Sequence, residues 1–93
     1  MNTINFEILC GSIKKVIPKA PITYLSESSI VFRGQRLDVN QNTARCSIFD
    51  LYFTSPETFL DGLKAYGLMI SYREMEQVMK EYRIGKTYSH EER

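Results

Sequence analysis

The sequence predicts a small α+β domain with the order α-β-β-β-α-α, in which helices pack on a three-stranded antiparallel sheet. Two observations lead to this fold class. Apolar residues recur at helical spacing in three segments, 4–17, 55–67 and 71–84. Between them, runs rich in β-branched and aromatic residues predict strands at 22–26, 28–39 and 44–54.

The first segment fits two periods. Its apolar residues recur with helical spacing over 6–17, although residues 4–10 also alternate as they would in a strand. The helical pattern is longer, and Pro18 provides a stop signal at its end. We therefore expect a helix, with Asn2 or Thr3 as its cap.

The strand pattern contains two turn signals. The apolar face of the second strand changes at Gly34, which predicts a bulge or a tight bend there. The polar run NQNT at 40–43 predicts a turn, so the last two strands should form an antiparallel hairpin.

Two helices should follow the strands. Ser55 and Pro56 suit the start of the first, and Gly67 suits its end. Its inward-facing residues should be Phe59, Leu60, Leu63 and Tyr66. The second should begin with a capping box, SYRE at 71–74, and end at Gly85. Its inward-facing residues should be Tyr72, Met75, Val78, Met79 and Tyr82.

Composition indicates an ordinary globular domain, with 43% apolar and 25% charged residues. Without a repeat or linker, we expect one domain over 1–85 and a polar C-terminal tail over 86–93. No segment resembles a membrane span or a secretory signal, so we expect a cytoplasmic protein without a membrane partner. Cys10 and Cys46, which lack CxxC spacing, should be buried reduced thiols.

Catalytic and metal chemistry find little support. The sole histidine, His90, lies in the polar tail, where a general base would not be held rigidly. Zinc needs three or four clustered Cys or His ligands, and no glycine-rich phosphate loop is present. Asp38 and Asp50 fit solvent-facing strand positions better than an acid–base pair. We therefore expect no enzyme activity, no cofactor and no metal.

One candidate binding surface lies on the predicted sheet. Its residues are Arg33, Gln35, Arg36, Arg45 and Tyr52. Arginine and tyrosine are enriched at protein–protein hot spots, and they also bind single-stranded nucleic acid. The same residues also suit a solvated sheet face, on which arginine stems cover apolar area.

A second candidate lies at the last two helices. Met69 and Ile70 fall in the turn between them and would mark a contact patch if both are exposed. Arg73 lies just beyond, on the outer face of the last helix.

The stretch LKAYGLMISYREMEQVMKEY at 63–82 fits both a core-closing helical hairpin and a DNA-reading helix-turn-helix. Glu74 and Glu76 lie in the first turns of the second helix, where a DNA reader approaches phosphates. The net charge of +1 also gives no basic surplus. The core-closing hairpin is favoured.

The sequence therefore predicts a non-enzymatic protein-binding module that docks through its sheet face or its C-terminal helix pair. Its size suits a small regulator or inhibitor encoded by bacteria or their mobile elements, on composition alone. The alternative is a nucleic-acid-binding regulator that uses the helix pair at 55–84 or the arginine-bearing sheet. An uncovered strand edge would also permit homo-oligomers.

Overall fold

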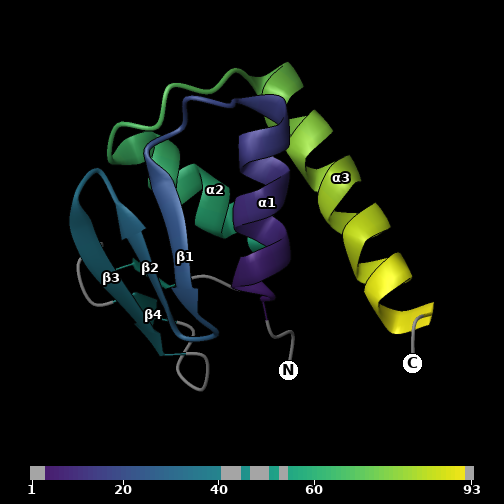
Figure 1. Ribbon diagram of the computed structural model, residues 1–93. Helices are drawn as coiled ribbons and strands as arrows, with labels where there is room; N and C mark the ends of the chain where they lie inside the picture. Colours follow the sequence, from purple (N-terminus) through teal and green to yellow (C-terminus); the bar gives the residue numbers. More distant parts are fainter. Residues whose placement is uncertain (1–3, 41–44, 47–50, 53–54, 92–93) are drawn as a thin grey trace.

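The structure, a computed structural model, describes residues 4–40, 45–46, 51–52 and 55–91 (Figure 1). Helices and antiparallel strands follow one another in the predicted order, which confirms the α+β fold class. The elements are α1 (Phe6–Val16), β1 (Ile22–Ser26), β2 (Ser29–Phe32), β3 (Gln35–Asn40), β4 (Arg45–Cys46), β5 (Leu51–Tyr52), α2 (Pro56–Ala65) and α3 (Tyr72–Glu91).

The main body of the sheet is a three-stranded antiparallel meander, β1-β2-β3, and the short strands β4 and β5 continue it in chain order. The second predicted strand is β2 and β3 together, folded back on each other. The fold occurs at Arg33, with φ 53°, and Gly34, with φ 79°. Two successive positive φ angles match the twist of a tight hairpin, so the bend predicted at Gly34 is confirmed.

The hairpin predicted around 40–43 is also present. Val39 pairs with Cys46 and Asn40 pairs with Arg45, both antiparallel. The third predicted strand is represented by β4 and β5, which pair with each other. The turn at 41–44 and the connection at 47–50 lie outside the described residues.

The first segment is helical, and its strand alternative is wrong. α1 begins at Phe6 because Asn5 acts as its cap: the Asn5 side chain accepts a hydrogen bond from the Ile8 N–H at 3.0 Å. The predicted caps, Asn2 and Thr3, lie outside the described residues. The helix ends at Val16, two residues before Pro18, as the sequence pattern indicates.

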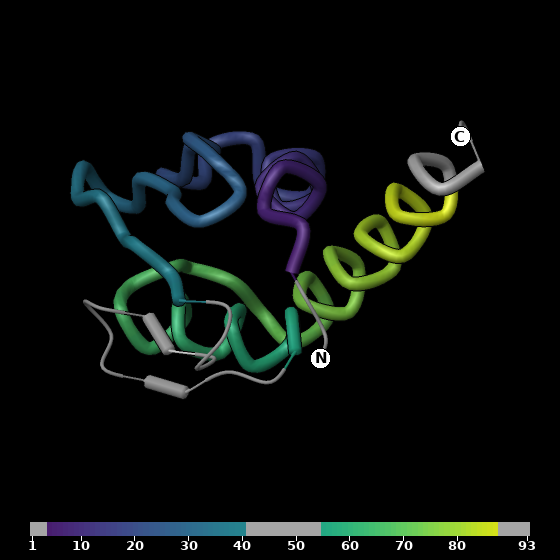
Figure 2. The backbone as a smooth tube through the Cα atoms, turned by 90° about the horizontal axis from the view of Figure 1, so that it is seen from below, coloured from purple at the N-terminus to yellow at the C-terminus, as the bar shows by residue number. Residues whose placement is uncertain are grey.

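α1 lies between the sheet and α3 in both views (Figures 1 and 2), and α2 lies behind α1 in Figure 1 and to one side of it in Figure 2. A single hydrophobic core joins the three helices to β1, β2 and β3. Phe6 of α1 and Phe59 of α2 meet edge to face there, with ring centroids 5.2 Å apart. The largest fully buried side chains are Phe6, Phe59, Ile4, Leu9, Ile13, Ile22, Ile30, Leu37, Leu60, Leu63 and Val78.

α3 does not end at Gly85, contrary to the prediction, but continues to Glu91. Gly85 serves close packing instead: a Cβ built on it would lie 2.7 Å from Ile8 Cγ2 of α1. The antiparallel helices α1 and α3 therefore approach closely at this point (Figure 1). Within the described part of the chain, no helix is both long and apolar enough to cross a bilayer.

Candidate functional site

Three large apolar side chains are exposed around the connection between α2 and α3. Tyr66 is 44% exposed, Met69 87% and Tyr72 76%. In the described part of the chain, the other large apolar residues with notable exposure are scattered over β1 and the later part of α3: Tyr24, Leu25 and Ile84. Gathered apolar side chains mark contact surfaces more often than scattered ones do. We call Tyr66, Met69 and Tyr72 the turn surface.

The core anchors the chain on both sides of Met69. Leu68 is 2% exposed and Ile70 is 7% exposed. Because both neighbours point inward, the side chain between them points to solvent. The condition set for a patch of Met69 and Ile70, that both be exposed, is therefore met by Met69 alone, since Ile70 belongs to the core.

The end of α2 holds the turn surface in place through backbone hydrogen bonds. The Leu68 N–H donates to the Leu63 carbonyl at 2.9 Å, and the Gly67 N–H donates to the Lys64 carbonyl at 3.2 Å. This pair of bonds is a Schellman motif. Gly67 has φ 110°, a conformation that L side chains rarely adopt, so the predicted stop at Gly67 is confirmed.

The start of α3 is fixed in the same way. The Ser71 N–H donates to Glu74 Oε1 at 2.9 Å, and the Glu74 N–H donates to Ser71 Oγ at 3.1 Å. The predicted capping box is therefore present. With a Schellman motif before it and a capping box after it, Met69 is displayed on an ordered backbone.

Arg33 reaches the same turn from the tip of the β2–β3 hairpin. Its Nη1 donates to the carbonyl oxygen of Tyr66 at 3.2 Å, and its guanidinium fills the space that a Cβ on Gly67 would need. The last carbonyls of a helix lack intrahelical partners and carry partial negative charge. Arg33 thus caps α2 and links the sheet to the turn surface.

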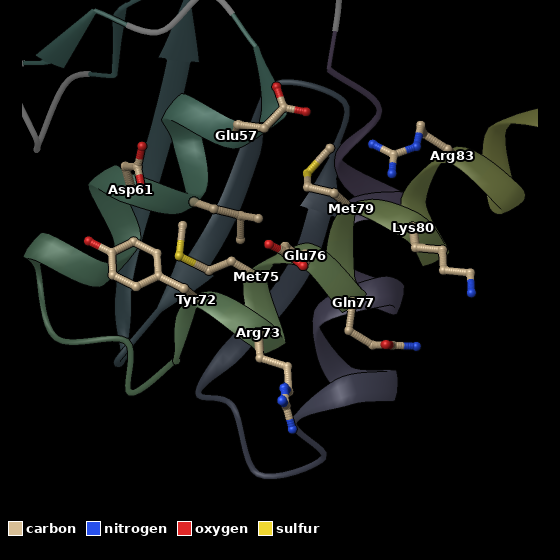
Figure 3. Close-up of a pocket in the computed structure, with 11 residues that line it drawn as sticks. Glu57, Asp61, Tyr72, Arg73, Met75, Glu76, Gln77, Met79, Lys80 and Arg83 are labelled. Atoms are coloured by element: carbon tan, nitrogen blue, oxygen red, sulfur yellow. The ribbon is translucent and has the colours of Figure 1, made fainter.

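A groove with a volume of about 590 Å³ adjoins the turn surface between α2 and α3 (Figure 3). Leu60 of α2 and Met75 and Met79 of α3 form its apolar floor, and Tyr72 lines one end. The Lys64 ammonium lies 4.0 Å from the centre of the Tyr72 ring, within cation–π range. This contact connects α2 to the first residue of α3 where the groove meets the turn surface.

The groove carries opposite charges on its two sides. α2 contributes the carboxylates of Glu57 and Asp61. α3 contributes the cations Arg73, Lys80 and Arg83, together with one carboxylate, Glu76. Among the residues that the structure describes, no ion pair joins the two sides. The charges that line the groove therefore stay available to a partner.

The structure describes three side chains of the predicted sheet surface: Arg33, Gln35 and Arg36. Arg36 Nε donates to Asp38 Oδ1 at 3.0 Å on the same strand, so its charge is paired locally. Gln35 is exposed beside the hairpin tip, where Arg33 turns toward α2. The side chains of Arg45 and Tyr52 lie outside the described part of the chain.

Two of the candidate residues predicted at the helix pair lie at the exposed site. Met69 lies on the turn surface and Arg73 lines the groove. The sequence reasoning missed Tyr66 and Tyr72, which it placed in inward-facing stripes. Their positions at helix ends were the available signal: Tyr66 directly precedes the stop glycine, and Tyr72 directly follows the cap. Side chains at helix ends have fewer core neighbours than those one turn further in.

The other reactive groups that the structure describes give no second site. Cys10 is a free, buried thiol, as predicted, and burial raises its pKa to about 12 against a smaller opposing effect of Lys14. In the described ranges, no three His, Cys, Asp or Glu residues are placed to hold a metal ion. The side chains of Cys46 and His90 are not among those described.

Comparisons with protein-family models, curated proteins and solved structures find no match to this chain.

Proposed function

We propose that this protein is a non-enzymatic, cytoplasmic protein-binding module that docks through the turn surface and the adjoining groove. The observation that supports it most directly is the exposure of Tyr66, Met69 and Tyr72 between two hydrogen-bonded helix caps. Ordered apolar side chains bind without the entropy cost of fixing a loop. Tyrosine and methionine are also enriched at protein interfaces. A contact of this kind suits a small regulator or inhibitor that covers a surface of its partner.

The charges of the groove define the chemistry of the partner. α2 presents carboxylates, α3 presents mainly cations, and the floor between them is apolar. A complementary surface carries apolar side chains along its middle, with cations facing α2 and carboxylates facing α3. The partner is therefore a protein surface with a charge-divided apolar stripe.

The first test uses a photo-crosslinking amino acid at Met69 in the full chain, with the same probe at Leu25 of β1 as a matched exposed control. We expect the probe at Met69 to crosslink one protein in cells of the source organism and the control to give no such product. Mass spectrometry identifies the product, and the identified protein is then purified for binding measurements.

Affinity measurements with the purified partner then test the surface itself. Met69→Ser and Tyr72→Ser should each weaken binding about 30-fold, because central apolar anchors contribute about 2 kcal/mol each. Leu25→Ser should bind as the wild-type protein does. Wild-type affinity in both turn-surface variants would contradict the proposal.

Nucleic-acid binding is the competing outcome of these tests. The residues that connect α2 to α3, 66–71, form a longer turn than the about three or four residues of a helix-turn-helix. Carboxylates on the α2 side of the groove would also repel phosphates. Tight binding to random duplex DNA that weakens steeply with salt would favour the nucleic-acid function and count against the present one.

A further inference from the structure

We infer that the partner for this surface is a second copy of the same chain, so that the protein forms a symmetric dimer through its α2–α3 grooves. The inference rests on the proposed function, because it names the occupant of the same surface. The charge division of the groove carries it. Glu57 and Asp61 on α2, and Arg73 and Arg83 on α3, give one molecule both halves of the required complement.

Symmetry decides how two such grooves can meet. In a two-fold dimer the same patch of each molecule faces its own copy. If the two-fold axis runs across the groove, α2 faces α2, and Glu57 and Asp61 meet carboxylates. If the axis runs along the groove, α2 of each copy faces α3 of the other, and carboxylates meet cations. Like charges placed against each other oppose association, so the axis along the groove is selected.

The positions of the charges along the groove then set the pairs. In Figure 3, Glu57 lies toward the end of the groove that holds Arg83, and Asp61 lies toward the end that holds Tyr72. A two-fold axis along the groove keeps these ends in register. Glu57 of each copy therefore faces Arg83 of the second copy. Asp61 of each copy faces the other end of the second copy's groove, near Arg73 at the start of α3.

The apolar side chains complete the interface. Met75 and Met79 lie on the floor, where they are 9% and 7% exposed, so the second copy would cover only their outer edges near the two-fold axis. Methionine side chains are unbranched and flexible, so they can repack against one another at such a position. Tyr72 at the end of the groove adds exposed aromatic area that the second copy would cover.

The strand edge is a weaker route to a dimer. β1 is the terminal strand of the sheet, but its pairing with β2 is irregular between Tyr24 and Ser26. Such a bulge twists an edge strand and discourages edge-to-edge pairing. The groove has no comparable obstruction.

Charge reversal tests the geometry directly. Sedimentation equilibrium of the full wild-type chain over a range of concentrations should show a monomer–dimer equilibrium. Glu57→Lys and Arg83→Glu should each weaken the dimer at least about tenfold, because each places two like-charge contacts in the interface. Glu27→Lys, in the exposed turn between β1 and β2, is the matched control and should dimerise as the wild type does.

Mixing the two single variants is the decisive measurement. In the mixed dimer, Lys at position 57 faces Glu at position 83, and the native Arg83 faces the native Glu57. A heterodimer should therefore form with near wild-type affinity from two chains that each fail to self-associate, and the double variant should recover a homodimer.

Three results would overturn the inference: a wild-type chain that stays monomeric at millimolar concentration, single variants that dimerise as well as the wild type, or a mixture that does not recover association. A monomer that still crosslinks a foreign protein through Met69 would leave the proposed function standing. A monomer without any Met69-dependent crosslink would remove both.

Discussion

The two sides of α3 differ in how they meet the rest of the molecule. On the side of α1, the helices pack closely at Gly85 and Ile8, and the Asn5 N–H donates to the Tyr82 hydroxyl at 3.0 Å. On the side of α2, a groove remains, with Tyr72 exposed at its end and with charges that no ion pair among the described residues joins across it. We call these the packed side and the open side.

The difference separates stability from binding along one helix. Close packing at Gly85 and a partly buried hydrogen bond lie on the packed side. The open side also contributes buried side chains, Met75 and Met79 on the groove floor, but its exposed residues make no comparable contacts. The open side can change its surface chemistry without disturbing those contacts. Substitutions on the two sides should therefore have separable effects, on folding for one and on association for the other.

The largest expected difference is in thiol reactivity, between the buried Cys10 and a cysteine placed on the turn surface. Burial raises the pKa of Cys10 on α1 to about 12, whereas an exposed cysteine has a pKa near 8.5. The thiolate is the reactive form, so Met69→Cys should be alkylated at least about a thousand times faster than Cys10. Alkylation rates at pH 8, read by mass spectrometry in a Cys46→Ser background, measure the ratio. Similar rates at the two positions would show that the α1 thiol is not closed off.

The same thiol makes stability depend on pH in a defined direction. Its folded pKa of about 12 exceeds the ordinary thiol value of 9.0, so the folded state holds the proton more tightly. The contribution of Cys10 is fully present below pH 9.0 and is lost as pH rises through about 12. Cys10→Ala should lose this part of the alkaline destabilisation, which urea unfolding at a series of pH values measures against the wild type.

Truncation on the two sides of α3 should affect folding unequally. Val78 is fully buried, and Val78→Ala should lower the free energy of unfolding by about 2 kcal/mol through lost burial and a residual cavity. Tyr72→Ala, on the open side, should change it by no more than about 1 kcal/mol, through loss of the exposed cation–π contact with Lys64. Urea unfolding with matched slopes gives both values. A large loss for Tyr72→Ala would mean that the turn surface stabilises the fold rather than awaiting a partner.

Alanine substitutions at two helical glycines should change the free energy of unfolding in opposite directions. Gly11, in the middle of α1, has open space around its Cα, so Gly11→Ala should stabilise by about 0.5–1 kcal/mol. Gly85→Ala gains the same propensity, but its Cβ meets Ile8 Cγ2 at 2.7 Å and overpacking costs about 1–3 kcal/mol. We expect a net loss near 1 kcal/mol.

A double variant checks that Ile8 is the cause of that loss. Ile8→Ala removes the methyl group that a Cβ at position 85 would strike. Gly85→Ala should therefore be less destabilising in the Ile8→Ala background than in the wild type. Equal losses in the two backgrounds would assign the effect to something other than this contact.

Gly85 also shows a limit of structure prediction from the sequence. A glycine late in a helical pattern is a stop signal when it leads into a loop, and it permits close packing when another helix lies against it. The local pattern is the same in both cases, so only the position of α1 distinguishes them. Helix ends that are set by local hydrogen bonds could be predicted, because the residues that set them are close together in the sequence. The start of α3, fixed by the capping box of Ser71 and Glu74, is an example.

The candidate site was partly predictable on the same grounds. Met69 and Arg73 were found because the turn between the last helices is a local feature. The role of Arg33 could not be found, because it depends on the hairpin tip meeting Tyr66 across the fold. The opposite charges of the groove depend likewise on how α2 and α3 are placed, which no spacing within either helix records.

The smallest expected effect concerns an ion pair of the packed side, between Lys15 Nζ of α1 and Glu81 Oε1 of α3 at 3.0 Å. The lysine is largely exposed to solvent, so water and salt screen the attraction. Lys15→Gln should lower the free energy of unfolding by no more than about 0.5 kcal/mol, and the difference should vanish at high salt. Urea unfolding at low and high salt measures it. Among the charges of the open side, Glu57 lies in the first turn of α2, where a carboxylate interacts favourably with the helix dipole. Glu57→Lys should therefore lower the unfolding free energy of the monomer by no more than about 1 kcal/mol. A loss well above about 1 kcal/mol in Glu57→Lys would contradict the division between the two sides.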